Sequence, residues 1–449
     1  MTARSFAWPL LAGALVASAP APARATAPGA FGHDPSSVGL AQADVADSDA
    51  ANAPQANPAL AADPGFRIRL GYAYGAMNLR LDRKPAGVRN VSGVDLSAQY
   101  GKELVRDWTL GLAIGGHIPD EHIARISFRP ATEPQFVRYE ASLARTALDL
   151  VAALRFRNFS LGGGVSALLD VGGKGTTFTL GQDGSGTYAD AATDVELPYR
   201  FAPLIGARAD LGPVALGASF RGALAVDLGL RSVNRVALTD NPLNGTTTVL
   251  VSGTSGYDPA VIDLGARVAI GGGFSAHAAL EYAFYSAAPP PVADVVLDVQ
   301  LNTSPSQRQA HFVLPRFRDT LSPRLGLELL VRDDTSRGKA VEGLLGETIA
   351  RDSDWRFALT AGYVLSPSPV PRQTGLTSYA DATRHGIALG SSLRLGAYAG
   401  VDLRLSLAGQ LHVLAKREER KPSDALPHAR YDVSGNILYG SAAIEGTWH

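Results

Sequence analysis

The sequence predicts an all-β protein: a transmembrane, antiparallel, up-and-down β-barrel of about 14 strands with an N-terminal plug segment in its lumen. Three observations favour this class. Long runs alternate between apolar and polar residues, short and long connections alternate between these runs, and a stretch of small residues precedes them. We divide the 449 residues into a signal peptide (1–25), a plug segment (26–64) and a barrel (65–449).

Residues 1–25 have the pattern of a secretory signal peptide. Arg4 supplies a positive start, a short apolar stretch follows, and Ala23-Arg24-Ala25 is a cleavage site of the A-x-A type. The alternative is a membrane anchor, but the apolar stretch is too short to span a bilayer and Pro9 interrupts it. No later segment has the run of about 18 apolar residues that a transmembrane helix needs. We therefore expect strands to make any membrane crossing.

Residues 29–60 are rich in small and acidic residues and poor in large apolar ones. Such a stretch cannot bury enough apolar surface to fold alone. Directly after it, from Phe66, the long alternating runs begin. We expect the stretch to fold back inside the barrel as the plug.

The barrel strands are predicted from an alternation with a period of two. Between residues 146 and 157, for example, Leu148 and Leu150 fall on one face, whereas Asp149 and Arg155 fall on the other. Such runs exceed the roughly five or six residues of soluble strands and suit the about 9–11 that cross a bilayer. We expect strands near residues 66–80, 91–101, 107–117, 143–157, 159–171, 199–210, 213–227, 258–270, 273–286, 319–332, 354–365, 384–396, 399–414 and 430–448.

The connections between these strands alternate in length, as they do in outer-membrane barrels. Short turns are expected at residues 101–106, 157–158, 210–213, 271–273 and 396–397. Long polar loops are expected at residues 118–142, 172–199, 228–257, 287–318, 366–383 and 415–430. Residues 332–354 break this alternation of lengths, and we interpret them as an enlarged turn. The centre of this turn has the composition of a short helix. The turn could instead dock another protein.

The polar face of the strands is expected to line the lumen. Its charged and amide side chains include Arg67, Arg69, Asp149, Arg155, Asp402, Arg404 and Gln410. We expect these groups to pair with one another and with Asp44, Asp47 and Asp49 of the plug.

Composition excludes several functions. The chain has 41 basic and 42 acidic residues and a formal net charge of −1, without the basic excess of a nucleic-acid binder. It has no cysteine and therefore no thiol nucleophile or thiolate metal site. The hydrolase motif G-x-S-x-G is absent. We expect no enzyme activity, no cofactor and no nucleic-acid partner.

Two polar patterns remain as weak candidates for a site. His117 and His122, with Asp120 and Glu121, could hold a metal on a loop, but the sequence places no complete ligand set there, and we expect no metal site. Residues 172–176 resemble a phosphate-binding loop only superficially, because the full spacing is missing, and a flexible loop is the favoured interpretation.

Two blocks of sequence resemble the FadL/TodX-type outer-membrane transporters of fatty acids and other hydrophobic compounds. The first block resembles that family's hatch and comprises Ser36-Ser37-Val38-Gly39-Leu40, Val45-Ala46-Asp47-Ser48-Asp49-Ala50 and Asn57-Pro58-Ala59-Leu60. The second resembles its late strands and comprises Arg318-Asp319-Thr320, Arg324-Leu325-Gly326-Leu327-Glu328, Ala361-Gly362-Tyr363, Ser366-Pro367-Ser368-Pro369-Val370-Pro371 and Asp381-Ala382-Thr383-Arg384-His385. The region between residues 118 and 318 resembles the family only in its alternation of strands with short and long connections.

The resemblance implies a channel in the outer membrane of a Gram-negative bacterium. Such a channel takes up hydrophobic molecules passively, long-chain fatty acids first, by capture at the outer loops, movement of the hatch and diffusion out of the barrel. The hatch residues implied are Gly39, Leu40, Asp47, Asp49, Asn57, Pro58 and Ala59. The alternatives are a general porin, a structural barrel without hydrophobic specificity, and a membrane-embedded lipid hydrolase.

Two further groups of residues are candidate sites. Aromatic residues of the loops could supply contacts to an apolar ligand, or could pack the loops on themselves: they are Phe128, Phe136, Tyr139, Phe178 and Tyr188. The trio Asp381, Arg384 and His385 is expected at the outer rim of the barrel, as a structural charge cluster in preference to a direct ligand contact.

The expected partners follow from the barrel class. They are a hydrophobic small molecule, outer-membrane lipid and lipopolysaccharide. Outer-membrane barrels commonly end on an aromatic residue that the barrel-assembly machinery recognises, and here Trp448 is penultimate. We expect a monomer.

Overall fold

The structure, a computed structural model, describes residues 27–47, 54–120, 132–139, 146–169, 172–183, 186–196, 199–238, 244–288, 294–301, 304–311, 316–332, 340–342, 348–350, 356–398 and 401–448. The expected signal peptide therefore lies outside the described residues. No helix in the described part of the chain is long and apolar enough to cross a membrane.

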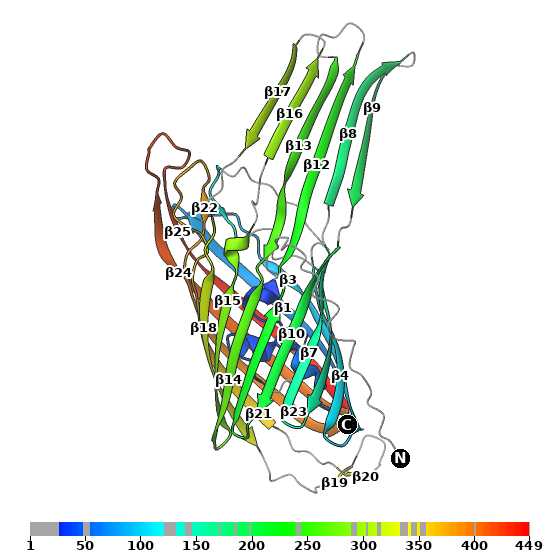
Figure 1. Cartoon of the computed structure of the whole chain (residues 1–449), viewed down its shortest axis with the longest axis vertical. Coiled ribbons are helices and arrows are strands. Elements are labelled where there is room, and N and C mark those ends of the chain that lie inside the picture. Colours follow the sequence, from blue (N-terminus) through cyan, green and yellow to red (C-terminus); the bar gives the residue numbers. More distant parts are fainter. Residues whose placement is uncertain are drawn as a thin grey trace, which may run out of the picture.

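Fourteen of the described strands form one closed antiparallel barrel (Figure 1). In order around the barrel they are β1 (Gly65–Leu81), β25 (Arg430–Trp448), β24 (Val401–Arg420), β23 (Arg384–Tyr398), β21 (Arg356–Ser366), β18 (Thr320–Arg332), β15 (Phe274–Ala283), β14 (Val261–Gly271), β11 (Val214–Arg221), β10 (Tyr199–Asp210), β7 (Phe159–Leu169), β6 (Thr146–Phe156), β4 (Trp108–Pro119) and β3 (Val91–Val105). Each overlaps one of the fourteen expected runs, and the predicted fold class is confirmed.

Strand β1 closes the barrel because it pairs on both sides. Phe66 lies opposite Trp448 of β25 and opposite Tyr100 of β3. The ring of fourteen strands therefore has no edge whose backbone groups lack a partner strand, which is the condition for crossing a lipid bilayer with strands.

The alternation of residues separates an apolar outer face from a polar lumen. On β1, Leu70 and Tyr72 point outward and are 49% and 46% exposed, whereas Arg69 points inward and is 4% exposed. The same holds on β6, where Leu150 is exposed and Asp149 is buried. Large apolar side chains turned outward on strand after strand fit contact with lipid. The expected lumen face is confirmed on these strands.

The two ends of the barrel differ. We call the end that carries the long connections the loop end, and the opposite end the turn end. The chain enters β1 and leaves β25 at the turn end (Figure 1).

The N-terminal residues 27–47 and 54–64 lie within the barrel, and we call them the N-terminal segment (Figure 1). The segment contains helices α1 (Ala27–Phe31) and α2 (Pro35–Gly39) and the 3₁₀ helix η2 (Pro58–Ala62). Helix α2 begins after Asp34, whose Oδ1 accepts hydrogen bonds from the backbone nitrogens of Ser36 (2.6 Å) and Ser37 (3.1 Å). These helices are short, and the segment owes its shape to contacts with the wall.

Glycines on the inner face of the wall make room for the N-terminal segment. A Cβ atom at Gly206 of β10 would lie 2.0 Å from Oδ1 of Asn57, and one at Gly162 of β7 would lie 2.4 Å from the carbonyl carbon of Pro58. On β21, a Cβ at Gly362 would lie 2.6 Å from the carbonyl carbon of Leu40. The segment therefore packs directly on the main chain of the wall, which larger residues at these positions would prevent.

Three of the expected long loops contain strands, which corrects the prediction of flexible or irregular loops at residues 172–199, 228–257 and 287–318. A separate six-stranded sheet extends from the loop end (Figure 1). Its order is β17 (Ser304–His311), β16 (Asp294–Leu301), β13 (Gly245–Asp258), β12 (Leu224–Ala237), β8 (Gly172–Asp183) and β9 (Gly186–Glu196). The runs are rich in threonine and valine, which favour strands, and β8 pairs in parallel with β12.

Short elements complete the described fold. The enlarged turn contains a small hairpin of β19 (Ala340–Glu342) and β20 (Thr348–Ala350) where a short helix was expected. The remaining elements are β2 (Lys84–Pro85), β5 (Gln135–Phe136), β22 (Tyr379–Ala380) and the 3₁₀ helix η4 (Tyr285–Ala287).

Candidate functional site: two cavities beside the N-terminal segment

Side-chain amides fix the main chain of the N-terminal segment. Nδ2 of Asn57 donates to the carbonyl oxygens of Val45 at 2.9 Å and of Ala207, in β10, at 3.0 Å. Nε2 of Gln410, in β24, donates to the carbonyl oxygen of Val38 at 2.8 Å. Buried backbone carbonyls need hydrogen-bond donors, and these amides donate to three of them.

Ion pairs between the wall and the segment also hold the segment in place. Arg69 Nη1 lies 3.0 Å from Asp34 Oδ2, and both side chains are almost fully buried. Arg155 Nη1 lies 2.9 Å from Asp63 Oδ1. Lumen arginines therefore pair with acidic groups of the segment, as expected. The acidic partners in these two pairs, however, are Asp34 and Asp63. Of the three acidic residues named from the sequence, Asp47 lies 3.9 Å from Arg267, and Asp49 lies outside the described residues.

Asp44 is buried in the N-terminal segment beside other acidic groups. Burial, followed by the nearby carboxylates of Asp34 and Asp47, raises the pKa of Asp44 to about 7, although a hydrogen bond from Ser37 opposes the shift. This carboxyl group therefore keeps its proton to a higher pH than an ordinary aspartate while the segment is in place.

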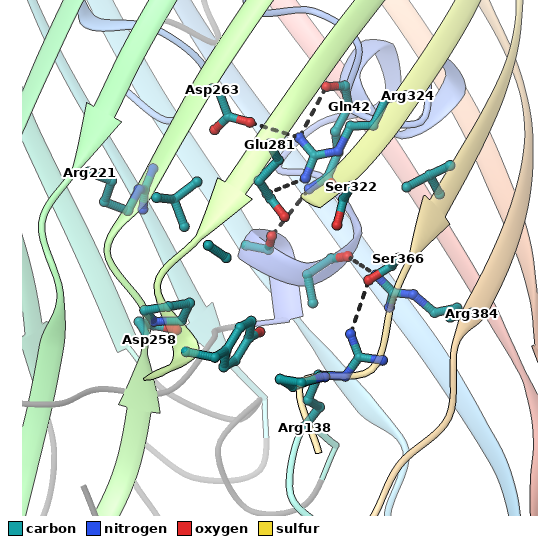
Figure 2. A pocket seen from close by; sticks show the side chains of 18 of the residues that line it. Gln42, Arg138, Arg221, Asp258, Asp263, Glu281, Ser322, Arg324, Ser366 and Arg384 are labelled. Atoms are coloured by element: carbon teal, nitrogen blue, oxygen red, sulfur yellow. Dashed lines mark hydrogen bonds and ion pairs between the residues drawn. The ribbon is translucent and has the colours of Figure 1, made fainter. Parts of the chain in front are cut away.

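A cavity of about 170 Å³ lies on the loop-end side of the N-terminal segment. We call it the loop-side cavity (Figure 2). The segment contributes its floor through Ser37, Gln42 and Asp44. The wall and loops contribute apolar and aromatic groups, among them Val137, Tyr139, Tyr257, Tyr285, Phe317 and Val364.

Four arginines also line the loop-side cavity (Figure 2). Arg324 pairs with Glu281 and with Asp263, whose Oδ1 lies 3.4 Å from Nη1. Arg138 donates to Ser366 Oγ at 3.0 Å and pairs with Asp381. The cavity thus joins an apolar surface to guanidinium groups, which suits an amphipathic ligand.

The remaining two arginines bind main-chain oxygens of the N-terminal segment. Arg221 Nη2 donates to the carbonyl oxygen of Gln55 at 2.9 Å, and Arg384 Nη2 donates to that of Ala30 at 3.1 Å. Among the described residues, neither forms an ion pair with a carboxylate.

A second cavity of about 260 Å³ lies on the turn-end side of the same segment. We call it the turn-side cavity. Pro35, Ser36, Leu40 and Asp47 of the segment line it. Its wall is strongly basic and includes Arg267, Arg356, Arg394 and Arg404, together with Glu328. Residues 35–47 thus contribute to both cavities and lie between them.

The hatch residues expected from the sequence are packed against the wall. Leu40 and Ala59 are each 1% exposed. Gly39 approaches Gly390 of β23 so closely that a Cβ at Gly39 would lie 3.1 Å from the Cα of Gly390. Pro58 lies against the inner glycines of β7 and β10. These residues form contacts between the segment and the wall, and Asp47 and Leu40 also face the turn-side cavity.

The expected aromatic contacts are dispersed. Tyr139 lines the loop-side cavity, whereas Phe136 is fully buried beside it, with ring centroids 6.3 Å apart. Phe178 lies on β8, in the six-stranded sheet, and is 40% exposed. Phe128 lies outside the described residues, as does the side chain of Tyr188.

The three residues of the expected rim cluster each bind other partners. Asp381 is buried, accepts a hydrogen bond from Ser368 Oγ at 2.7 Å and lies 2.9 Å from Arg138 Nε. Arg384 lies with its guanidinium 4.9 Å from the ring centroid of Phe31. His385, the next residue on β23, does not join them. Its Nδ1 lies 2.8 Å from Tyr363 Oη on the exposed outer side, because neighbouring strand residues point to opposite faces.

Sequence reasoning did not identify Arg138 as a site residue. It lies in a loop and pairs with Asp381, 243 positions later, and no local pattern marks such a contact.

The fold and the site define a class of protein. The described strands form a closed, fourteen-stranded transmembrane β-barrel with an apolar outer face, and a segment of the same chain occupies the lumen between two cavities. This architecture is that of Gram-negative outer-membrane barrels.

Comparisons with known proteins agree on the fold. No protein-family model and no curated protein matches the sequence. The structure is similar to the toluene transporter TodX of Pseudomonas putida, with a TM-score of 0.50 and 12% identity over 92% of this chain and 98% of that one. It is also similar to a FadL homologue of Pseudomonas aeruginosa (TM-score 0.48, 12% identity, 95% and 98% covered) and to CymD, a monoaromatic hydrocarbon channel (TM-score 0.46, 12% identity, 93% and 97% covered).

At this level of identity, the likeness to TodX concerns the fold alone. The chain has the fold of the FadL/TodX-type barrels, as the two sequence blocks implied.

Proposed function

We propose that this protein is an outer-membrane channel for the passive uptake of hydrophobic small molecules, with long-chain fatty acids as the first substrate class. In the proposed route, a ligand is captured at the outer loops and enters the loop-side cavity. The N-terminal segment then moves as a hatch, and the ligand diffuses out of the barrel. The route needs no ATP, cofactor or covalent chemistry.

One observation carries the proposal: residues 35–47 line both cavities. In the proposed route, a solute passes from the loop-side cavity to the turn-side cavity when this part of the chain moves. TodX, a toluene transporter, has the same fold, which is consistent with a hydrophobic cargo here.

The chemistry of the loop-side cavity favours a fatty acid over a plain hydrocarbon. Tyrosine, phenylalanine and valine side chains offer an apolar surface to an acyl chain. Arg221 and Arg384 offer guanidinium groups that donate to main-chain carbonyls, and a carboxylate is a stronger acceptor for a guanidinium. Arg221 and Arg384 lie on opposite sides of the cavity (Figure 2), so we assign the ligand carboxylate to one of these two arginines.

The test is uptake of labelled oleate by a Gram-negative host that lacks its own fatty-acid channel, with and without this protein. Oleate uptake should rise above the empty-vector control. At least one of the variants Arg221→Gln and Arg384→Gln should lower oleate uptake several-fold relative to uptake of labelled toluene, which has no carboxylate. Arg430→Gln, at an exposed ion pair with Asp424, is the matched control and should behave like the wild type.

Two results would contradict this proposal. Heat-modifiable gel mobility first establishes that each barrel is folded. If the folded wild type then gives no oleate uptake, fatty acids are not the cargo. If it conducts polar solutes freely in planar bilayers, the alternative of a general porin holds.

A further inference from the structure

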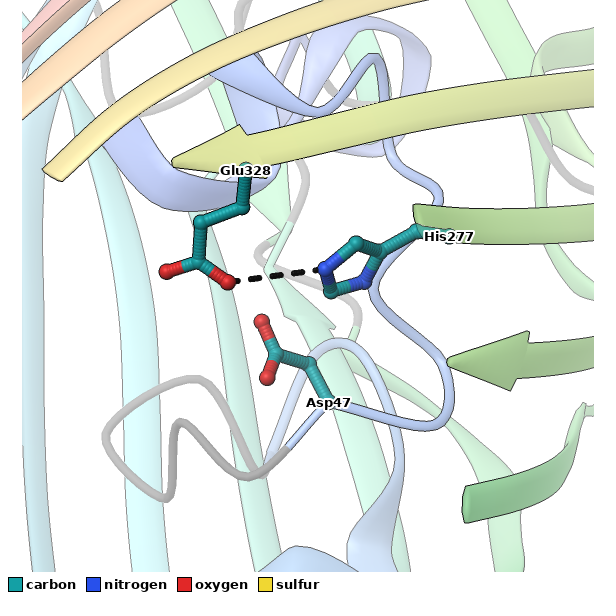
Figure 3. Close-up of side chains that lie close together, drawn as sticks. All are labelled: Asp47, His277 and Glu328. Atoms are coloured by element: carbon teal, nitrogen blue, oxygen red, sulfur yellow. Dashed lines mark ion pairs between the residues drawn. The ribbon is translucent and has the colours of Figure 1, made fainter. Parts of the chain in front are cut away.

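Three potential metal ligands from distant parts of the chain meet in the lumen (Figure 3). Asp47 belongs to the N-terminal segment, His277 to β15 and Glu328 to β18. One ligand atom of each lies within 4.8 Å of the others. Asp47 and Glu328 also line the turn-side cavity, so an ion dissolved there can reach them.

The spacing of these atoms fits a bound ion better than a simple ion pair. Nε2 of His277 lies 3.5 Å from Oε2 of Glu328. A charge-assisted hydrogen bond would bring such atoms to about 2.7–2.9 Å. Two ligands placed about 2.1 Å from a tetrahedral ion lie roughly 3.4 Å apart.

The environment of His277 directs Nε2 toward the carboxylates. The side chain is fully buried, and its described polar neighbours, Ser275 Oγ at 3.2 Å and Glu328, both lie at Nε2. The opposite nitrogen, Nδ1, is buried and has no hydrogen-bond partner among the described residues. Ser275 Oγ also donates to Glu328 Oε2 at 3.1 Å and thereby orients that carboxylate.

Two of the three groups are carboxylates, which attract a cation, and they lie in a cavity that is also lined by arginines. Arg267 is one guanidinium contact of Asp47, with its Nε 3.9 Å from Asp47 Oδ1. Imidazole with carboxylates is a donor set suited to Zn²⁺ and similar first-row ions.

We propose that Asp47, His277 and Glu328 bind a divalent cation of the Zn²⁺ type, and that this ion fastens the N-terminal segment to β15 and β18. Asp47 supplies the ligand from the segment, and the other two supply ligands from the wall. The fastening role rests on the proposed hatch function, whereas the ion site stands on the geometry alone.

The test for binding uses the purified, folded full-length protein in detergent after removal of metal by EDTA. Titration calorimetry with Zn²⁺ should show one site, and Co²⁺ should give the visible absorption of a tetrahedral complex. Asp47→Asn, His277→Gln and Glu328→Gln should each weaken Zn²⁺ binding by more than about tenfold. Zn²⁺ should raise the Tm of the wild type and not that of these variants.

His117→Gln is the matched control. His117 forms a buried pair with Asp95, with Nδ1 and Oδ1 3.0 Å apart, but this pair belongs to no three-ligand cluster among the described residues. The variant should bind Zn²⁺ like the wild type. If the wild type binds no Zn²⁺, or if all three ligand variants bind it unchanged, the site does not exist, and His277 and Glu328 form an ordinary ion pair.

A second measurement separates the site from the hatch. In planar bilayers, Zn²⁺ added from the turn-end side should lower the frequency of channel opening in the wild type and leave His277→Gln unaffected. If Zn²⁺ binds specifically but does not change the frequency of opening, the ion site exists and the proposed fastening role is wrong. Failure of oleate uptake would affect neither result.

Discussion

Nδ2 of Asn57 lies 3.0 Å from the carbonyl oxygen of Ala207, a wall residue 150 positions later in the chain. The same nitrogen donates to Val45, and Oδ1 of Asn57 accepts a hydrogen bond from the backbone nitrogen of Ala59 at the start of η2. One buried side chain thus joins two parts of the N-terminal segment to β10.

Replacing Asn57 by alanine should loosen the N-terminal segment. The change removes a helix cap and leaves two buried carbonyls without this donor, with an expected cost of about 2–3 kcal/mol. We expect a larger and noisier conductance in planar bilayers and faster proteolysis within residues 27–64. Asn57→Asp is the informative control, because it keeps the cap acceptor for Ala59 and loses the two Nδ2 bonds. Equal conductance of all three proteins would show that Asn57 does not hold the segment.

Adjacent glycines of β7 offer a matched pair of substitutions. A Cβ at Gly162 would lie 2.4 Å from the carbonyl carbon of Pro58, whereas one at Gly163 points to the other face and meets only the carbonyl oxygen of Leu204, at 3.6 Å. Gly162→Ala should therefore displace η2 and lower the stability of the seated segment by about 1–3 kcal/mol. Gly163→Ala should have little effect. The measurements are thermal unfolding and single-channel conductance, and identical behaviour of the two variants would contradict packing of Pro58 on the wall.

The sequence allowed prediction of the parts that lipid and close packing constrain. Alternating residues mark all fourteen barrel strands, because a strand between lipid and lumen must change polarity at every residue. The six-stranded sheet escaped prediction because its threonine-rich runs, such as β13, are neither uniformly apolar nor strictly alternating.

The candidate site could be predicted only in part. The resemblance identified Asn57 and Pro58, which do contact the wall. Pairs such as Arg138 with Asp381 depend on loops folding over the lumen, and the Asp47–His277–Glu328 cluster joins Asp47 to two residues more than two hundred positions later. Such contacts follow from the closure of the barrel, which local spacing does not encode.

The pair of Arg138 and Asp381 should be important for the structure of the loop end. The side chain of Asp381 is fully buried and that of Arg138 is only 11% exposed. Asp381→Asn would leave the guanidinium of Arg138 without its carboxylate, at an expected cost of about 3–5 kcal/mol. Asp424→Asn, at the exposed pair with Arg430, should change stability little. Thermal unfolding of both variants checks the contrast, and an equal Tm for the two would show that the buried pair contributes no more than a surface one.

Asp44 should make the seating of the N-terminal segment depend on pH. Burial and the neighbouring carboxylates raise its pKa from the ordinary 3.8 to about 7 while the segment is in place. The seated segment therefore binds a proton that the displaced segment, with a solvated carboxylate, releases. The resulting stabilisation is fully present below about pH 4 and is lost as the pH rises toward 7.

Channel opening should accordingly become more frequent between about pH 4 and pH 7, by at most about tenfold per pH unit for this single proton, and should change little above pH 7. Asp44→Asn keeps the shape of the side chain without the charge, so it should remove this dependence and hold the segment seated at pH 8. Glu103→Gln, at an exposed carboxylate near the turn end, should keep the wild-type profile. If Asp44→Asn keeps the wild-type pH profile, a group other than Asp44 controls the seating of the segment, because asparagine does not titrate.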